Sequence, residues 1–130
     1  MDTLARLMAY IEKSPSPFHA VRSAAALLEE AGFVRLEESR EWRLEEGGAY
    51  YVTRNQSSLI AFRLPTAALT GWRMTAAHSD SPTFRVKSDS MSGDKGYIRL
   101  EVEGYGGMNC ASWLDRPLTV AAPWWRRPPA

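Results

Sequence analysis

The chain has 130 residues, of which 45% are hydrophobic and 24% charged, and its formal net charge is +1. This size and composition are typical of a single globular domain and exclude a chain that is disordered throughout. The near balance of 16 basic and 15 acidic residues provides no electrostatic basis for binding nucleic acid or an anionic membrane, so we expect neither partner.

Several absences indicate the compartment. No apolar stretch is long enough to span a bilayer, and residues 1–6 lack the basic and apolar regions of a signal peptide. The single cysteine, Cys110, excludes an internal disulfide, and we expect it to be a small packed residue. Together these features predict a cytoplasmic protein.

Two amphipathic helices are predicted at the start of the chain. Apolar residues with helical spacing form one stripe over residues 4–11. The two prolines within residues 14–17 end this helix, because a residue that precedes proline avoids the helical region. A second helix is predicted over about residues 18–31, with Gly32 as its C-terminal stop.

Strand signals follow the helices. Runs rich in β-branched, aromatic or alternating apolar residues predict strands over residues 33–36, 49–53, 59–64, 72–77, 84–87 and 97–102. Residues 54–58 are typical of a hairpin turn, and the polar, glycine-containing residues 88–96 of a loop. Two helices followed by strands predict an α/β fold with a mixed sheet that is incomplete, the front of a larger domain.

The most informative segment is residues 76–82, Ala-Ala-His-Ser-Asp-Ser-Pro, at the end of the strand predicted over residues 72–77. In open α/β sheets, ligands bind outside the carboxyl ends of the strands. A neutral imidazole at His78 can bind a metal there. Asp80 can hydrogen-bond the other ring nitrogen, or that of a neighbouring ligand, and fix its tautomer. The pair favours metal-assisted hydrolysis, although a single histidine at a strand end is more often structural.

Other candidate residues have simpler interpretations. Ser79 and Ser81 flank the pair, but neighbouring residues point in different directions, so a Ser-His-Asp triad is geometrically poor. His19, the only other histidine, is expected to cap or pack the second helix. Asp115 is expected to pair with Arg116 or to cap a turn rather than to bind metal.

Five segments, taken in order, resemble a known family. They are SPSPFHAV at 14–21, GAYYVTRN at 48–55, SSLIAF at 57–62, AHSDSP at 77–82, and 105–118, in which Tyr-Gly-Gly is followed by Trp-Leu-Asp-Arg-Pro-Leu. Together they are similar to the M18 family of metalloaminopeptidases, the aspartyl aminopeptidase type. The resemblance implies that residues 1–120 are the N-terminal part of a zinc-exopeptidase-like catalytic domain.

The resemblance also implies a cytoplasmic enzyme with two zinc ions that removes N-terminal, often acidic, residues from peptides and assembles into a homododecamer. Carried onto this sequence, it makes His78 a zinc ligand and Asp80 the carboxylate that supports the metal site. No metal role is transferred to His19 or Asp115. Because a catalytic zinc uses roughly three protein ligands, we expect the isolated chain to be inactive, with the family's other ligands and its oligomer-building domain beyond Ala130.

Residues 121–130 depart from the family pattern. Pro123 would stop sheet pairing, and Trp124 and Trp125 would form an unusual exposed pair. We hypothesise an aberrant tail that results from a frameshift near Ala121; a genuine Pro/Arg-rich tail is the alternative. For the whole chain, the alternative function is a non-catalytic remnant or an α/β module that depends on a partner.

Overall fold

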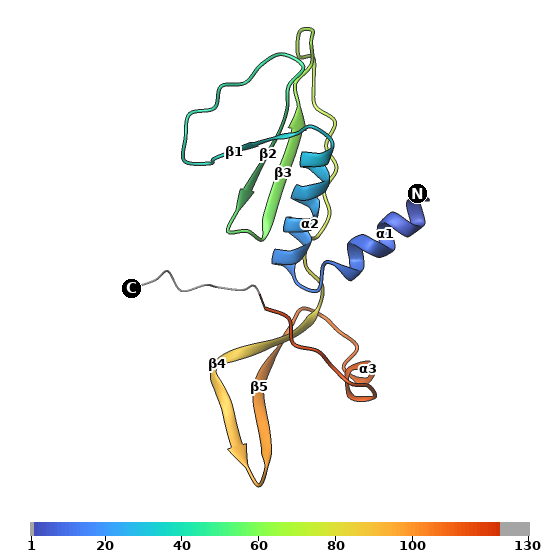
Figure 1. Ribbon diagram of the computed structural model, residues 1–130, viewed down its shortest axis with the longest axis vertical. Coiled ribbons are helices and arrows are strands. Elements are labelled where there is room, and N and C mark those ends of the chain that lie inside the picture. The colour runs from blue at the N-terminus through green and yellow to red at the C-terminus, as the bar shows by residue number, and fades with distance from the viewer. Residues whose placement is uncertain (1, 123–130) are drawn as a thin grey trace. The chain divides into compact units, whose positions relative to one another are not determined.

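The computed structural model describes residues 2–122, except for the side chains of residues 89–91 and 94. It divides into two compact units, whose main segments are residues 1–80 and 81–120. The first unit contains α1 (Thr3–Glu12), α2 (Pro17–Glu30), β1 (Val34–Leu36), β2 (Ala49–Arg54) and β3 (Ser58–Arg63) (Figure 1). The second contains β4 (Thr83–Asp94), β5 (Tyr97–Tyr105) and the short helix α3 (Ala111–Leu114).

Both predicted helices are present. Before α2, the Ser16 hydroxyl accepts a hydrogen bond from the backbone N–H of His19 at 3.5 Å. Pro17 occupies the first helical position, where its missing N–H costs nothing. Gly32 follows the helix with a φ of +82°, a left-handed conformation that glycine adopts without steric cost. Within residues 2–122, no helix combines the length and apolar character needed to traverse a bilayer.

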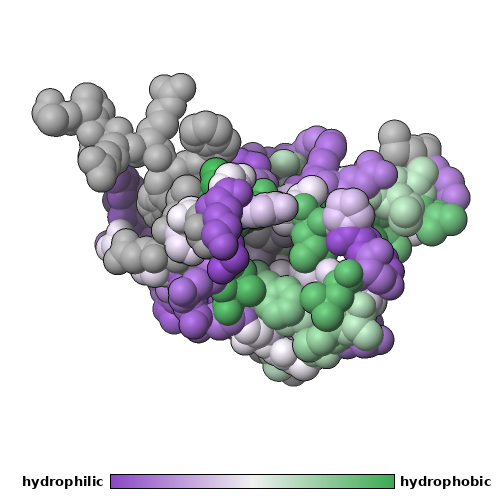
Figure 2. Space-filling model, turned by 90° about the horizontal axis from the view of Figure 1, so that it is seen from below, coloured by the Kyte–Doolittle hydropathy of each residue, from purple (hydrophilic) through white to green (hydrophobic). Residues whose placement is uncertain are grey.

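Much apolar surface remains exposed. The large apolar residues of α1 form the predicted stripe, and each is more than half exposed: Leu4, Leu7, Met8 and Ile11. Figure 2 shows apolar residues at the surface beside hydrophilic ones. Among the described residues, the buried hydrophobic ones are Ala20, Val21, Tyr50 and Tyr51.

The strands of the first unit form one mixed sheet. Its central strand, β2, runs parallel to β1 and antiparallel to β3, which agrees with the predicted α/β class. The predicted turn is confirmed, with Arg54 opposite Ser58 at its base. Asn55 and Gln56 have φ values of 51° and 56°, and the Ser57 N–H donates to the Arg54 carbonyl at 3.2 Å.

Two adjacent tyrosines of β2 form the centre of the core. Successive strand residues point to opposite faces, so the burial of both Tyr50 and Tyr51 means that both faces of β2 are covered. On one face, the Tyr51 hydroxyl donates to Glu29 Oε1 of α2 at 2.5 Å. Burial raises the pKa of Tyr51, and the adjacent Glu29 carboxylate raises it further.

The loop between β1 and β2 contributes to the other face. The Tyr50 hydroxyl accepts a hydrogen bond from the Glu45 N–H at 2.8 Å. The Tyr50 ring lies 5.7 Å from that of Phe62 on β3, which in turn stacks on Trp42 with centroids 6.3 Å apart. These aromatic contacts cover the face of the sheet opposite Tyr51.

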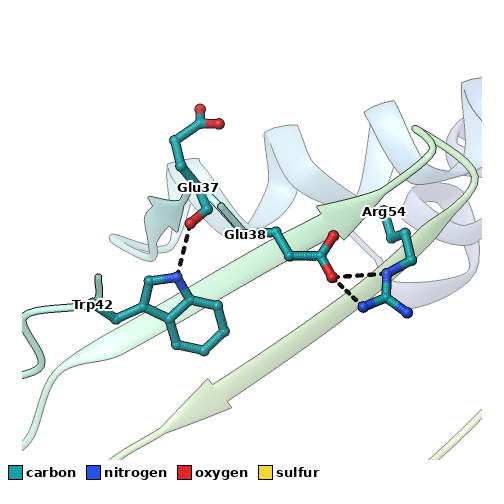
Figure 3. Close-up of polar contacts among 4 residues, drawn as sticks. All are labelled: Glu37, Glu38, Trp42 and Arg54. Atoms are coloured by element: carbon teal, nitrogen blue, oxygen red, sulfur yellow. Dashed lines mark hydrogen bonds and ion pairs between the residues drawn. The ribbon is translucent and has the colours of Figure 1, made fainter. Parts of the chain in front are cut away.

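Polar contacts hold the start of that loop (Figure 3). Trp42 Nε1 donates to the Glu37 carbonyl at 2.9 Å. Arg54 Nε donates to Glu38 Oε1 at 2.8 Å, and Arg54 Nη2 binds the same oxygen. The hydrogen bond from Arg54 lowers the pKa of Glu38. The pair links the segment after β1 to the end of β2, beside the hairpin turn.

The second unit extends further into sheet structure than the sequence predicts. The loop predicted over residues 88–96 is wrong for most of its length, because β4 continues to Asp94 and pairs with β5. A register shift between Val86 and Met91 interrupts the alternation that identifies a strand. Lys95 and Gly96, with φ values of 50° and 85°, form the two-residue turn. Cys110 is exposed rather than packed.

The strand predicted over residues 72–77 is also wrong. The segment has no regular secondary structure, and no described strand pairs with it. A strand requires a neighbour that exchanges backbone hydrogen bonds with it. Trp72 is 54% and Met74 is 88% exposed, so this apolar run contributes surface rather than core.

Candidate metal centre

His78 and Asp80 lie in the irregular segment that follows β3. The structure brings their side chains together, with His78 Nδ1 3.1 Å from Asp80 Oδ1. The side chain of His78 is 93% exposed and that of Asp80 is 30% exposed. The imidazole is therefore accessible from solvent, whereas the carboxylate that holds it is largely covered.

The contact assigns a tautomer to His78. An ionised carboxylate only accepts hydrogen bonds, so in the neutral imidazole that pairs with it the proton lies on Nδ1 and the Nε2 lone pair is left available. In the part of the chain that the structure describes, no hydrogen bond to Nε2 is recorded. A metal-ligating histidine almost always donates its other ring N–H to a carboxylate, a carbonyl or water. The geometry of the pair therefore fits a metal ligand with its orienting carboxylate.

The donor set fits zinc in type but not in number. Imidazole nitrogen is a typical zinc donor, and a catalytic zinc takes roughly three protein ligands. Within residues 2–122, no group of three or more His, Cys, Asp and Glu side chains could hold a metal ion. His78 could thus supply one of the roughly three protein ligands that a catalytic zinc needs.

The other two candidates engage local partners. His19 Nδ1 lies 2.7 Å from Ser16 Oγ at the start of α2, as expected for a residue that supports the helix cap. Arg116 Nε donates to Asp115 Oδ1 at 2.7 Å, which confirms the expected ion pair. No contact of His19 with His78 is recorded among the described side chains.

One contact of this segment had no signal in the sequence. Ser79 Oγ donates to the backbone carbonyl of Ser57 at 2.8 Å, and Ser57 belongs to the β2–β3 turn. The Ser79 hydroxyl is thus engaged away from His78, which agrees with the rejection of a Ser-His-Asp triad. The turn itself was predictable, but its neighbour 22 residues later in the chain was not.

Comparison with known proteins gives a consistent result. A family profile described as "Aminopeptidase I zinc metalloprotease (M18)" matches residues 10–123. The chain is 48% identical over 117 residues to a "Probable M18 family aminopeptidase 2" of Pseudomonas paraeruginosa, and 47% identical over 117 residues to that of Pseudomonas putida. Each match covers 88% of this chain and 27% of the relative. The chain therefore spans about a quarter of the length of the curated relatives it matches.

Solved structures show the same similarity. The chain resembles one in the cryo-EM structure of the Ape4 and Nbr1 complex with a TM-score of 0.80 and 38% identity, covering 86% of this chain and 22% of that one. It resembles a chain of the S. cerevisiae mApe1 dodecamer with a TM-score of 0.76 and 33% identity, and the match covers 88% of this chain and 28% of that one. The match to the crystal structure of yeast aminopeptidase 1 has a TM-score of 0.70 and 33% identity, and it covers 86% of this chain and 27% of that one.

Proposed function

The chain belongs to the M18 family of aminopeptidases, and we propose that residues 1–120 contribute the N-terminal part of the family's catalytic domain, with His78 as a zinc ligand. The observation that carries the proposal is the 3.1 Å contact between His78 Nδ1 and Asp80 Oδ1, because it leaves Nε2 available to a metal. When bound there, zinc would supply Lewis-acid chemistry.

Asp80 acts on the imidazole rather than on a substrate. Its carboxylate accepts a hydrogen bond from the Nδ1–H group and so fixes the tautomer and the orientation of the ring. It also restricts rotation of an imidazole that solvent otherwise surrounds. Loss of such a partner typically lowers metal affinity by roughly 10- to 100-fold.

The activity proposed for the complete enzyme is removal of N-terminal residues, acidic ones in particular, from peptides in the cytoplasm. Its full site would hold two zinc ions. Roughly three quarters of each curated relative has no counterpart in this chain, and one imidazole is too few for a catalytic zinc. We therefore expect the 130-residue chain by itself to be inactive.

Oligomeric assembly is proposed for the complete enzyme only. A related structure is that of the mApe1 dodecamer, and an equivalent homo-oligomer would serve the complete enzyme. For residues 121–130 we propose an aberrant tail that results from a frameshift. The family match ends at residue 123, and residues 123–130 lie outside the described part of the structure. Resequencing across codon 121 tests this origin.

A second candidate function is a non-catalytic α/β module that depends on a partner. The exposed apolar stripe of α1 in the first unit favours it, and so, separately, do the exposed Ile98, Leu100 and Val102 of β5 in the second, because exposed apolar patches mark interaction sites. Such a module would have no need for a metal at His78. Zinc binding at this residue therefore separates the two candidates.

A zinc titration followed by NMR tests the proposed function. The chain has two histidines, so their ring signals can be followed separately. Addition of ZnCl₂ is expected to shift the signals of His78 and to leave those of His19 in place. Asp80→Asn is expected to weaken the binding by roughly 10-fold or more.

Two variants control this titration. His78→Gln is expected to abolish the zinc response, whereas His19→Gln is expected to retain it. Equal responses of both rings, or no response of His78, would contradict the proposed ligand. Hydrolysis of aspartyl- or glutamyl-p-nitroanilide by the purified chain would contradict its expected inactivity.

A further inference from the structure

We infer, on the basis of the proposed zinc role of His78, that Ser79 is a positioning residue that anchors His78 to the turn between β2 and β3. Its hydroxyl donates to the Ser57 carbonyl at 2.8 Å. Ser79 lies between the imidazole and the carboxylate in the chain. A bond from this middle residue to the sheet therefore restrains the backbone that carries both partners of the His78–Asp80 pair.

The segment needs such an anchor because regular structure does not hold it. Residues 64–82 contain no helix or strand, so no ladder of backbone hydrogen bonds fixes the position of His78. The imidazole itself is almost fully exposed and has few neighbours that restrict it. A metal ligand must nevertheless be held to within about 0.5 Å of its productive position.

The acceptor of the anchor belongs to a well-defined turn. Asn55 and Gln56 both adopt the left-handed region. Asparagine tolerates this conformation, whereas glutamine keeps it only where the surroundings enforce it. The Ser57 N–H donates to the Arg54 carbonyl, and Arg54 also binds Glu38 through its side chain (Figure 3). The Ser57 carbonyl is thus held by the sheet and by the segment that follows β1.

Ser79 and Asp80 perform different tasks. Asp80 lies two residues from His78 on the same segment, so it orients the ring relative to the local backbone. It does not by itself place that backbone relative to the rest of the first unit. The bond from Ser79 crosses 22 residues of sequence and supplies this second restraint.

A set of serine variants of the 130-residue chain tests the inference. Ser79→Ala removes the anchor, and Ser79→Thr keeps a hydroxyl at the same position. Ser81→Ala is the matched control. It removes a hydroxyl from the same loop, and no hydrogen bond of this hydroxyl is recorded among the described residues. Should Ser79→Ala fail to fold, the isosteric pair Ser79→Thr and Ser79→Val makes the same comparison.

Two readouts follow His78 in each variant. Without metal, the three-bond HN–Hα couplings of residues 78–80 report whether the backbone that carries the pair keeps one conformation. With ZnCl₂, the ring signals give the dissociation constant at His78. Ser79→Ala is expected to average the couplings and to raise the dissociation constant by roughly 10-fold, the lower end for loss of an outer-shell partner. Ser79→Thr and Ser81→Ala are expected to match the unsubstituted chain.

The outcomes separate this inference from the proposed function. Unchanged couplings in Ser79→Ala, or equal averaging in Ser79→Ala and Ser81→Ala, would overturn the anchor. An unsubstituted chain that does not bind zinc at His78 would refute the proposed ligand, and the metal-free couplings would still decide whether Ser79 holds the backbone of this segment. Averaging of the couplings with an unchanged dissociation constant would overturn the positioning role.

Discussion

Replacement of Tyr51 by phenylalanine tests the contact that joins α2 to the sheet. Tyr51 is 1% exposed, and the substitution removes its hydroxyl while the ring still fills the core. The lost interaction is the 2.5 Å hydrogen bond to Glu29 Oε1. A hydrogen bond to a charged group contributes about 1.5–3 kcal/mol. Glu29 is exposed and regains water, so we expect the free energy of unfolding to fall by about 1.5 kcal/mol, the lower end of that range.

The expected loss depends on pH. Burial, followed by the Glu29 carboxylate, raises the folded-state pKa of Tyr51 above the value of about 10 for an unperturbed phenol. The contribution of a group with a raised folded-state pKa is complete below its unfolded pKa and is lost as the pH rises through its folded pKa. The difference in unfolding free energy between the unsubstituted chain and Tyr51→Phe should therefore be constant near neutrality and should shrink above pH about 10.

Urea unfolding followed by far-ultraviolet circular dichroism at neutral and alkaline pH measures both effects. Glu29→Ala removes the same hydrogen bond from the other side. The double variant is therefore expected to be only slightly less stable than either single one, because substitutions that break one shared contact are not additive. Full additivity, or an unchanged stability of Tyr51→Phe at pH 7, would refute the stabilising role of this bond.

Two further stability changes are expected from local geometry. Gly48→Ala should lower the free energy of unfolding by about 1–3 kcal/mol, because a Cβ at Gly48 would lie 2.5 Å from Tyr50 Cε2. Gly71→Ala is its control in thermal melts, because a Cβ at Gly71 would have no heavy atom within 4 Å. Equal effects of the two substitutions would contradict the clash. Ser16→Ala should lower the free energy of unfolding by about 1 kcal/mol through loss of the α2 cap, whereas Ser16→Asp should retain most of the stability that the cap provides. A loss in Ser16→Asp as large as that in Ser16→Ala would exclude capping.

The elements whose signals are local were predictable from the sequence. The start of α2 is specified by Ser16 and Pro17, and its end by Gly32, all within a residue or two of the observed boundaries. The β2–β3 hairpin was predictable for the same reason, since its polar turn interrupts two β-rich runs. In each case neighbouring residues alone determine the backbone conformation.

The elements that depend on a distant partner were not predictable in the same way. The apolar run at residues 72–77 satisfies the composition of a strand, but no described strand pairs with it. Residues 88–94 lack that composition, yet they pair with β5 because the turn at Lys95 and Gly96 folds the chain back. Composition measures the tendency of a segment to pair, whereas pairing itself needs a partner in register.

The candidate site depends both on residues that are close in the sequence and on a contact between distant ones. The contact between His78 and Asp80 was predictable from their spacing, because two residues of one loop can meet without help from the rest of the chain. The contact between Ser79 and Ser57 depends on how the chain returns past the hairpin, and neither serine is distinctive in the sequence. The zinc role of the pair itself stays a prediction until the titration is made.

The turn between β2 and β3 is a place where substitutions should affect zinc binding indirectly. If the turn holds the ligand loop, then changes within the turn alter zinc binding without contact with the metal or with His78. Gln56, at a φ of 56°, is the test position, because glycine adopts this conformation without strain. Gln56→Gly should therefore preserve the position of the Ser57 carbonyl and the zinc affinity. A β-branched residue such as valine should displace this carbonyl, and so weaken its hydrogen bond with Ser79 and lower the zinc affinity. Equal zinc affinities in the two variants would show that the loop is held by other contacts.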